Sequence, residues 1–407
     1  MTTSSRHVRA GLYAVAVATA LTAGCGQAVP VRESANVHVQ TSTIEHWGSY
    51  FGGSGGLQDT QKSPVTIRLP GKIAEVGSSN STEYALMTDG NLYAWGMGNA
   101  GQLGNGRRLN SFTVPIRVRF PAGVKIWSIP TDAMPYDTGL AIDTTGHVWG
   151  WGKNFGGELC LRNAREHDTP VRLPLSHVTS TAGANNHALY DANGVVYACG
   201  WNADGDLGTG SWRSAARPTP VVRLDGSKVV TLVASFANSG ALMADGQYYD
   251  WGYNAAGQLG NGRLGKASDV PVLVRLSGQV TAVAEGGSLW NNGQTLALLS
   301  DGSVWGWGDN HACQVHIGPT AVPLPVRLRP LPSGSYVALA TGSATSYAIS
   351  STGAVYAWGV SHVGQVGNGL TRTVCRPVHI TSGGSQISST ADNVVVSISG
   401  GIQPAGP

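Results

Sequence analysis

Charged residues are scarce in this chain, and helical patterning is absent. Asp, Glu, Lys and Arg make up only 12% of the 407 residues, and no segment keeps a 3.6-residue apolar period for three turns. The second absence excludes a fold built on amphipathic helices. The chain has instead 57 Gly, 20 Pro, 12 Trp and 13 Tyr, a composition too apolar and aromatic for disorder. Short strands joined by tight turns, and hence an all-β fold, are predicted.

Common signatures of catalysis are also missing. The chain has no His-Glu-x-x-His and no Cys-x-x-Cys, which excludes the usual zinc-protease and dithiol sites. GMGNAG (96–101) and GNGRLG (260–265) match Gly-x-Gly-x-x-Gly. Neither opens a predicted helix, which a pyrophosphate site of this kind requires. We therefore predict no cofactor and no enzymatic activity, and we expect a binding protein.

The start of the chain has the pattern of an export signal. Arg6 and Arg9 precede an apolar run over residues 11–23. This run is shorter than the roughly 20 residues that span a bilayer as a helix. Residues 1–24 are therefore predicted to be a signal peptide.

The residues at the predicted cleavage site indicate a lipid anchor. The segment TAGC (22–25) resembles a lipoprotein cleavage site, although Thr22 replaces the usual Leu. We expect Cys25 to be lipidated and residues 25–36 to form a linker, which places the protein on the outer face of a bacterial membrane. Plain secretion, with Cys25 unmodified, is the alternative.

Net charge gives no reason to expect nucleic acid as a partner. Removal of residues 1–24 takes away two Arg and no acid, which leaves 24 basic against 23 acidic residues and a net charge of +1. A nearly neutral chain lacks the basic excess of nucleic-acid-binding proteins. We expect a monomer that contacts the membrane only through its lipid anchor.

A repeat dominates the sequence. In six segments a Gly turn is followed by a short aromatic strand and a second Gly six residues later, and a glycine-rich stretch and a Pro-Val or Pro-Ile strand follow. Asp-Gly and Asn-Gly favour tight hairpin turns, and the alternating residues favour half-buried strands. The six segments are DGNLYAWG (89–96), TGHVWGWG (145–152), NGVVYACG (193–200), DGQYYDWG (245–252), DGSVWGWG (301–308) and TGAVYAWG (352–359).

A seventh copy is divided between the two ends. HWGSYFGGSGGLQ (46–58) and SPVTIRLPG (63–71) supply its second half, and SQISSTADNVVVSISGG (385–401) supplies its opening strands. Repeats of this length fit the four-stranded blades of a β-propeller. We predict seven blades over residues 37–401, closed by pairing of the two ends, with residues 402–407 as a tail.

This repeat resembles that of the RCC1 family. The best copies are WGMGNAGQLGNG (95–106) and WGYNAAGQLGNG (251–262), and the resemblance covers nearly all of residues 37–401. It implies a seven-bladed propeller. For function it implies less, because one fold supports many activities.

Four cysteines remain in the repeats. Cys313 replaces a repeat Gly and is a candidate for a disulfide with Cys375 of the next blade. Cys160 replaces a repeat Gly and Cys199 replaces the repeat Trp, so these two are a second candidate pair. A metal site is the weaker interpretation, and its candidate ligands are His311, Cys313 and His316.

Loops that differ between blades are the predicted partner-binding surface, because a rigid frame presents them. Large side chains in the loops before the Ala-Leu strands are the first candidates, and aromatic residues after the motif Gly form a second set. The candidates are Met134, Tyr136, Phe236, Trp290 and Asn291 in the first set and Trp201 and Tyr253 in the second.

Three functions are consistent with these features. The favoured one is an envelope-tethered or secreted scaffold that binds a protein or a glycan. The resemblance also implies two alternatives, namely an exported β-lactamase inhibitor with similar repeats and a guanine-nucleotide exchange factor. The predicted export argues against the latter, whose partner is cytoplasmic or nuclear.

Overall fold

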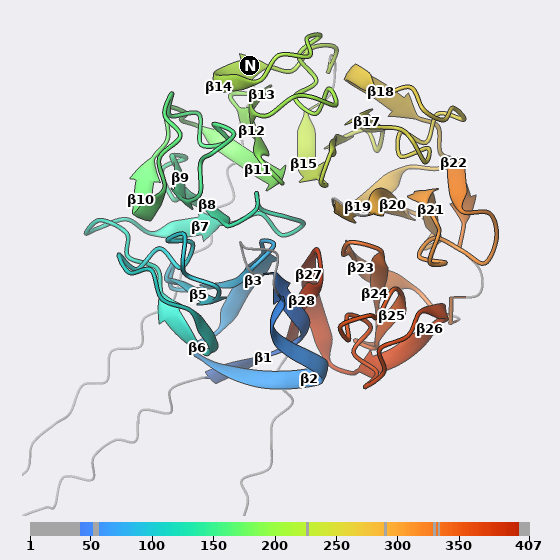
Figure 1. Cartoon of the computed structure of the whole chain (residues 1–407), viewed down its shortest axis with the longest axis horizontal. Coiled ribbons are helices and arrows are strands. Elements are labelled where there is room, and N and C mark those ends of the chain that lie inside the picture. The colour runs from blue at the N-terminus through green and yellow to red at the C-terminus, as the bar shows by residue number, and fades with distance from the viewer. Residues whose placement is uncertain are drawn as a thin grey trace, which may run out of the picture. The chain divides into compact units, whose positions relative to one another are not determined.

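A computed structural model describes residues 41–51, 57–224, 228–288, 291–328, 331–332 and 334–398. Every element in these ranges is a β-strand, and the strands form seven four-stranded antiparallel sheets arranged around one axis (Figure 1). This confirms the predicted seven-bladed β-propeller. No helix in the described ranges is long and apolar enough to cross a membrane. The predicted signal peptide, Cys25 and the linker lie outside the described residues.

Blades are numbered in chain order, with their strands given from the axis outwards. Blade 1 contains β3 (Ile73–Ser78), β4 (Thr82–Met87), β5 (Leu92–Gly96) and β6 (Ser111–Arg117). Blade 2 contains β7 (Ile126–Ser128), β8 (Thr138–Asp143), β9 (Val148–Gly152) and β10 (His167–Arg172). Blade 3 contains β11 (Val178–Ala184), β12 (His187–Ala192), β13 (Val195–Gly200) and β14 (Ala215–Pro220).

The remaining blades repeat this order. Blade 4 contains β15 (Val229–Ala234), β16 (Asn238–Met243), β17 (Tyr248–Gly252) and β18 (Ser268–Val274). Blade 5 contains β19 (Val280–Ser288), β20 (Asn291–Leu299), β21 (Val304–Asp309) and β22 (Ala321–Arg327). Blade 6 contains β23 (Tyr336–Thr341), β24 (Thr345–Ser350), β25 (Val355–Gly359) and β26 (Val374–Thr381).

Blade 7 combines both ends of the described chain. Its inner strands are β27 (Gly384–Thr390) and β28 (Asn393–Ile398), and its outer strands are β1 (Thr41–Phe51) and β2 (Leu57–Pro70). β1 pairs with β28 from Thr43 opposite Ile398 to Gly48 opposite Asn393. The predicted closure of the ring is confirmed. Blade 7 stands between blades 6 and 1, so the ring has no gap between them.

A glycine lies at or near the end of the third strand of every blade for a steric reason. Gly359, for example, has φ +108°, and a Cβ at this position would lie 2.4 Å from the carbonyl oxygen of Ala344. The N–H of Val360 donates to the same oxygen at 2.9 Å. Across the seven blades this distance is 2.0–2.7 Å, so no other residue fits. The glycines are Gly48, Gly96, Gly152, Gly200, Gly252, Gly308 and Gly359.

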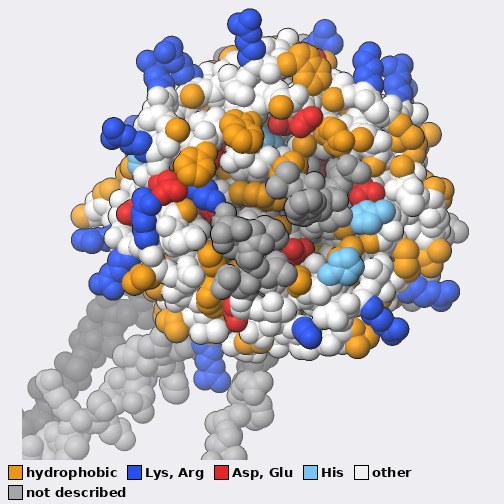
Figure 2. All heavy atoms as spheres, in the orientation of Figure 1, with side chains coloured by type: hydrophobic (Ala, Val, Ile, Leu, Met, Phe, Trp, Pro, Cys, Tyr) orange, Lys and Arg blue, Asp and Glu red, His pale blue; other side chains and the backbone are white. Residues whose placement is uncertain are grey.

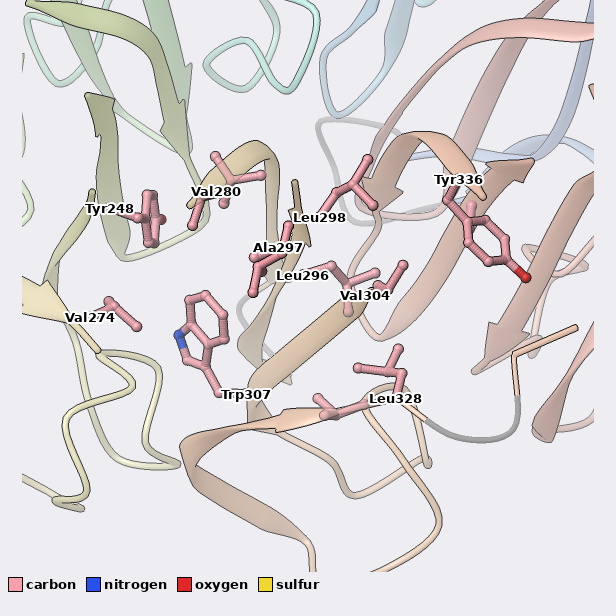
Figure 3. Packing of buried hydrophobic residues seen from close by; sticks show 14 of the residues in the cluster. Tyr248, Val274, Val280, Leu296, Ala297, Leu298, Val304, Trp307, Leu328 and Tyr336 are labelled. Atoms are coloured by element: carbon pink, nitrogen blue, oxygen red, sulfur yellow. The ribbon is translucent and has the colours of Figure 1, made fainter. Parts of the chain in front are cut away.

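The tryptophan before this glycine joins neighbouring blades. In Figure 3 the Trp307 indole of blade 5 lies beside Val274 and Tyr248 of blade 4. Its Nε1 also donates to the backbone oxygen of Gln258 of blade 4 at 2.7 Å. Four other Trp side chains make the same bond to the preceding blade, namely Trp47, Trp151, Trp251 and Trp358.

Disulfides supplement these contacts between blades. Cys199 of blade 3, which stands in place of the Trp, is bonded to Cys160 in the loop of blade 2. Cys313 of blade 5 is bonded to Cys375 of blade 6. The first disulfide joins the two blades at the point where a Trp side chain would otherwise make the link.

The motif glycine gives the first testable prediction. Gly359→Ala introduces a methyl group against the Ala344 carbonyl as well as an unfavourable φ, and we expect it to lower the free energy of unfolding by roughly 3 kcal/mol or more. Gly194→Ala is the control, because φ is +76° there and nothing lies within 4 Å of the added methyl. The control should lose only about 1–2 kcal/mol. Urea unfolding measures both, and equal losses would refute the steric explanation.

Candidate binding face

Two sets of loops lie on the same face of the ring. The loops between the first and second strands accept hydrogen bonds from the starts of the loops between the third and fourth strands. Trp201 N–H donates to Asn186 O, and Tyr253 N–H donates to Ala237 O, each at 2.9 Å. We call this surface the loop face. The two sets of partner-binding candidates, separate in the sequence, therefore share one surface.

Aromatic side chains form a group on the loop face over blades 2 to 4. The rings of Tyr136 and Phe236 are 6.1 Å apart, and both residues are half-buried. Trp201 is 50% exposed and Tyr253 is half-buried. We define the aromatic arc as these four residues together with Phe155, which is 55% exposed. Figure 2 shows hydrophobic side chains around the middle of the ring.

Phe155 is the member that the sequence analysis missed. Phe155 begins the tight turn after Asn154. The corresponding position is also exposed in blades 1, 3, 4, 5 and 6, and it holds Ala203 in blade 3 and Ala255 in blade 4. The neighbouring Gly156 packs against Trp201, because a Cβ there would lie 3.0 Å from Cδ1 of the Trp201 indole. An aromatic residue at a position held by Ala in sister repeats was the available signal.

A buried ion pair supports this part of the face. The Nζ atom of Lys153 bonds to the carboxylate of Asp137, and it lies 5.9 Å from the centre of the Phe155 ring. The Asp137 side chain is almost fully buried. The Lys153 side chain is therefore held beside Phe155, where its cation interacts favourably with the ring.

Met134 is not a surface residue, which corrects the prediction from the sequence. Its exposed fraction is 0%, and it packs with Ile129 and Ile126 in a hydrophobic cluster. The residue is buried because its loop turns inward instead of outward. Trp290 lies outside the described residues. Asn291 begins β20, and its side chain lies outside the described part of the chain.

The inward turn fills the axis of the ring. We define the axial loop as residues 129–137, between β7 and β8, and Figure 1 shows it extending to the middle of the ring. Met134 N–H donates to Ser78 O of blade 1 at 3.0 Å, and Gly183 N–H of blade 3 donates to Ala133 O at 3.2 Å. Ser388 Oγ of blade 7 donates to Asp132 O at 3.2 Å.

The axial loop also buries an acid. The Asp132 carboxylate lies near Glu285 of blade 5, and its Oδ2 atom is buried with no hydrogen-bond partner among the described residues. Burial raises the pKa of Asp132, and the neighbouring Glu285 carboxylate raises it further. Burial likewise raises the pKa of Glu285 to about 7. The axial loop is therefore held by hydrogen bonds to blades 1, 3 and 7, and it meets blade 4 through the Tyr136–Phe236 ring contact.

A second buried acid lies where blade 7 meets blade 1. Glu83 Oε2 accepts hydrogen bonds from Tyr50 Oη of blade 7 at 2.9 Å and from Trp95 Nε1 of blade 1 at 2.6 Å. Burial raises the pKa of Glu83 to about 8. The blade made from both chain ends is thus joined to blade 1 through a carboxyl group that is mostly protonated at neutral pH.

The weak metal candidates do not form a ligand set. The Sγ atom of Cys313 is bonded to Cys375. His311 Nδ1 lies 2.7 Å from Asp309 Oδ2, and His316 Nδ1 lies 3.2 Å from Asn310 Nδ2. Among the described residues no group of three or more His, Cys, Asp or Glu side chains is arranged to hold a metal ion.

The architecture is that of a closed β-propeller with one face made of variable loops. The regulator of chromosome condensation (RCC1) repeat model matches residues 89–129, 193–238, 245–289 and 352–403. These four matches show that the chain contains RCC1 repeats in four stretches of the propeller. The resemblance inferred from the sequence is confirmed.

Curated relatives share the repeats at moderate identity. The chain is 28% identical over 334 residues to the ultraviolet-B receptor UVR8 of Arabidopsis thaliana, which covers 79% of this chain and 74% of that protein. It is 30% identical over 216 residues to the probable E3 ubiquitin-protein ligase HERC3 of Homo sapiens. That alignment covers 51% of this chain but only 20% of HERC3.

Solved structures agree on the fold. Human WBSCR16 superposes with a TM-score of 0.75 and 21% identity, and it covers 89% of this chain and 100% of its own. Prp20p of Saccharomyces cerevisiae gives a TM-score of 0.73 and 21% identity, with 89% and 93% covered. At this identity the likeness establishes the fold alone.

Glu83 predicts how stability depends on pH. Its pKa in the folded protein, about 8, exceeds the ordinary value of 4.5, so the folded state holds the proton more tightly. Stability should therefore fall as the pH rises from about 4.5 to about 8, by up to roughly 1.4 kcal/mol per pH unit. Glu83→Gln keeps an oxygen for Trp95 and removes the titration. Urea unfolding across this range should show a weaker pH dependence in the variant, and identical slopes would contradict the assignment.

Proposed function

We propose that this propeller is a non-enzymatic scaffold that binds a protein partner through the loop face. The observation that carries the proposal is the aromatic arc, in which Phe155 and Trp201 are half exposed on a rigid frame. Aromatic side chains are the most frequent energetic anchors of protein interfaces. Because the frame is fixed by contacts between blades, little conformational entropy is lost on binding.

Related propellers support a protein rather than a small molecule as partner. Prp20p has been studied for its binding to Gsp1p and histones, and it also forms a complex with Kap60. The ligase relatives extend far beyond the part that this chain matches, since the chain covers 20% of HERC3 and 7% of human HERC2. Their enzymatic activity is therefore no argument for an activity of this chain.

The position of the chain start is compatible with a tether. β1 begins at Thr41 near Ile398, at the end of the blade opposite the loop face, and reaches the loop face at Gly48. A tether attached before β1 is therefore compatible with a loop face that is free to meet a partner. Glycan binding and inhibition of a β-lactamase are the other uses of such a face.

The aromatic arc predicts which substitutions abolish binding. Phe155→Ala combined with Trp201→Ala should weaken the partner complex at least about tenfold, because each ring contributes roughly 1–2 kcal/mol or more. Trp127→Ala is the matched control. Trp127 is 55% exposed and lies in β7, at the end of blade 2 opposite the loop face. Photo-crosslinking from position 236 identifies the partner, and titration then gives each affinity. Equal affinity for the double variant and the wild type would remove the loop face from the proposal.

The anchor is tested separately. Palmitate labelling in the native cell should disappear in a Cys25→Ala variant, because the acylated thiol is lost. The same variant should appear in the medium or as a soluble envelope protein. Labelling that persists in the variant would leave secretion without a lipid as the surviving interpretation.

A further inference from the structure

Basic side chains outnumber exposed acidic ones in the loops of the loop face, although the whole chain has a formal charge of only +3. The six described loops between third and fourth strands, in blades 1 to 6, contain nine Lys and Arg residues. Only two of their acids, Glu166 and Asp204, are not buried. The cations are Arg107, Arg108, Lys153, Arg162, Arg165, Arg213, Arg263, Lys266 and Arg372.

Most of these cations have no acidic partner among the described residues. Arg108 pairs with Glu166 and with Asp168, and Lys153 pairs with Asp137. No ion pair with a described carboxylate involves the other seven, and six of them are Arg. Figure 2 shows Lys and Arg side chains mainly around the outline of the ring, and hydrophobic side chains both at the outline and nearer the middle.

Large apolar residues accompany the cations. Leu109, Trp212, Leu264 and Leu370 are 43–67% exposed, in the loops of four different blades. Each lies within two residues of an arginine in the sequence. These loop ends lie near the outer strand of the next blade, as shown by the bond from Gly262 N–H to Pro323 O at 2.8 Å. The same pair of side-chain types therefore recurs around the rim.

From this arrangement we propose that the partner is an acidic protein whose contact surface surrounds an apolar centre with carboxylates. This inference rests on the proposed function and specifies its partner. The aromatic arc provides the apolar centre, and the arginines without an ion pair provide a positively charged rim. A protein interface typically has an apolar centre and a polar rim, and arginine is enriched in it. Complementary charge at the rim accelerates association and selects the partner.

A bilayer fits this layout less well. Membrane-binding surfaces place their apolar residues together at the most protruding point, with the cations behind them. Among the described residues of the loop face, the largest exposed aromatic side chains lie over blades 2 to 4, whereas cations without an ion pair to a described carboxylate occur in the loops of blades 1, 2, 3, 4 and 6. A protein partner with an asymmetric surface can match the aromatic side chains and the cations at the same time. A uniform lipid surface cannot.

The test uses a defined acidic polypeptide. Fluorescent random copolymer of Glu and Tyr is titrated with the purified protein at low and moderate salt, beside poly-Glu and beside vesicles of phosphatidylglycerol and phosphatidylcholine. We expect the Glu-Tyr copolymer to bind most tightly. Its affinity should fall about tenfold between roughly 50 and 300 mM NaCl, because exposed charge pairs are screened.

Charge-reversal variants locate the contact. Arg213→Glu with Arg263→Glu changes the loop face, and Lys228→Glu with Arg275→Glu makes the same change of charge at exposed positions on the opposite face. The first pair should weaken copolymer binding about tenfold, and the second should leave it within about twofold of the wild type. Thermal unfolding of both double variants checks that each is folded.

The outcomes separate this inference from the proposed function. Equal loss in the two double variants, or tighter binding to vesicles than to the copolymer, would overturn the acidic-protein partner. If the crosslinked natural partner depends on Phe155 and Trp201 but not on Arg213 and Arg263, the loop face remains the binding surface and only its charge selectivity is refuted.

Discussion

In each blade one backbone carbonyl, in the loop between the two inner strands, determines how the loop face is built. The motif glycine approaches this oxygen more closely than any side chain allows, and in blade 6 the following N–H of Val360 donates to it. The contact holds the end of the third strand against the first loop. Because it recurs around the ring, both loop sets emerge on the same side, and the aromatic and basic residues share a surface as a consequence of backbone packing.

Contacts between blades vary more than contacts within them. Five indole N–H groups bond to the preceding blade, whereas blade 3 uses the Cys199–Cys160 disulfide. In blade 1 the Trp95 indole instead donates to the Glu83 carboxyl group, which also accepts a bond from Tyr50. That exception occurs where the preceding blade is made from both chain ends. The requirement is therefore a bond across each boundary, and its chemistry can differ.

The repeat predicted the fold because its glycines are imposed by local backbone geometry, which the sequence displays directly. The site was less predictable. Met134 looks like an exposed residue in a long loop, but its burial depends on Ser78 and Gly183, which are distant in sequence. Phe155 was missed because the repeats were aligned on their glycines, and Phe155 stands at a variable position between them. Opposite charges nearly cancel in the whole chain, so the basic rim became visible only when the loops were placed on one face.

Closure of the axis determines what kind of ligand the propeller can accept. The axial loop is held by hydrogen bonds to blades 1, 3 and 7, and its Asp132 carboxylate lies beside Glu285. A ligand that enters along the axis would have to displace these bonds and expose two carboxyl groups whose pKa values burial has raised. In the proposed complex the partner rests on the loop face and leaves these bonds intact. There the cations would guide its approach over several blades, and the aromatic arc on blades 2 to 4 would fix its orientation.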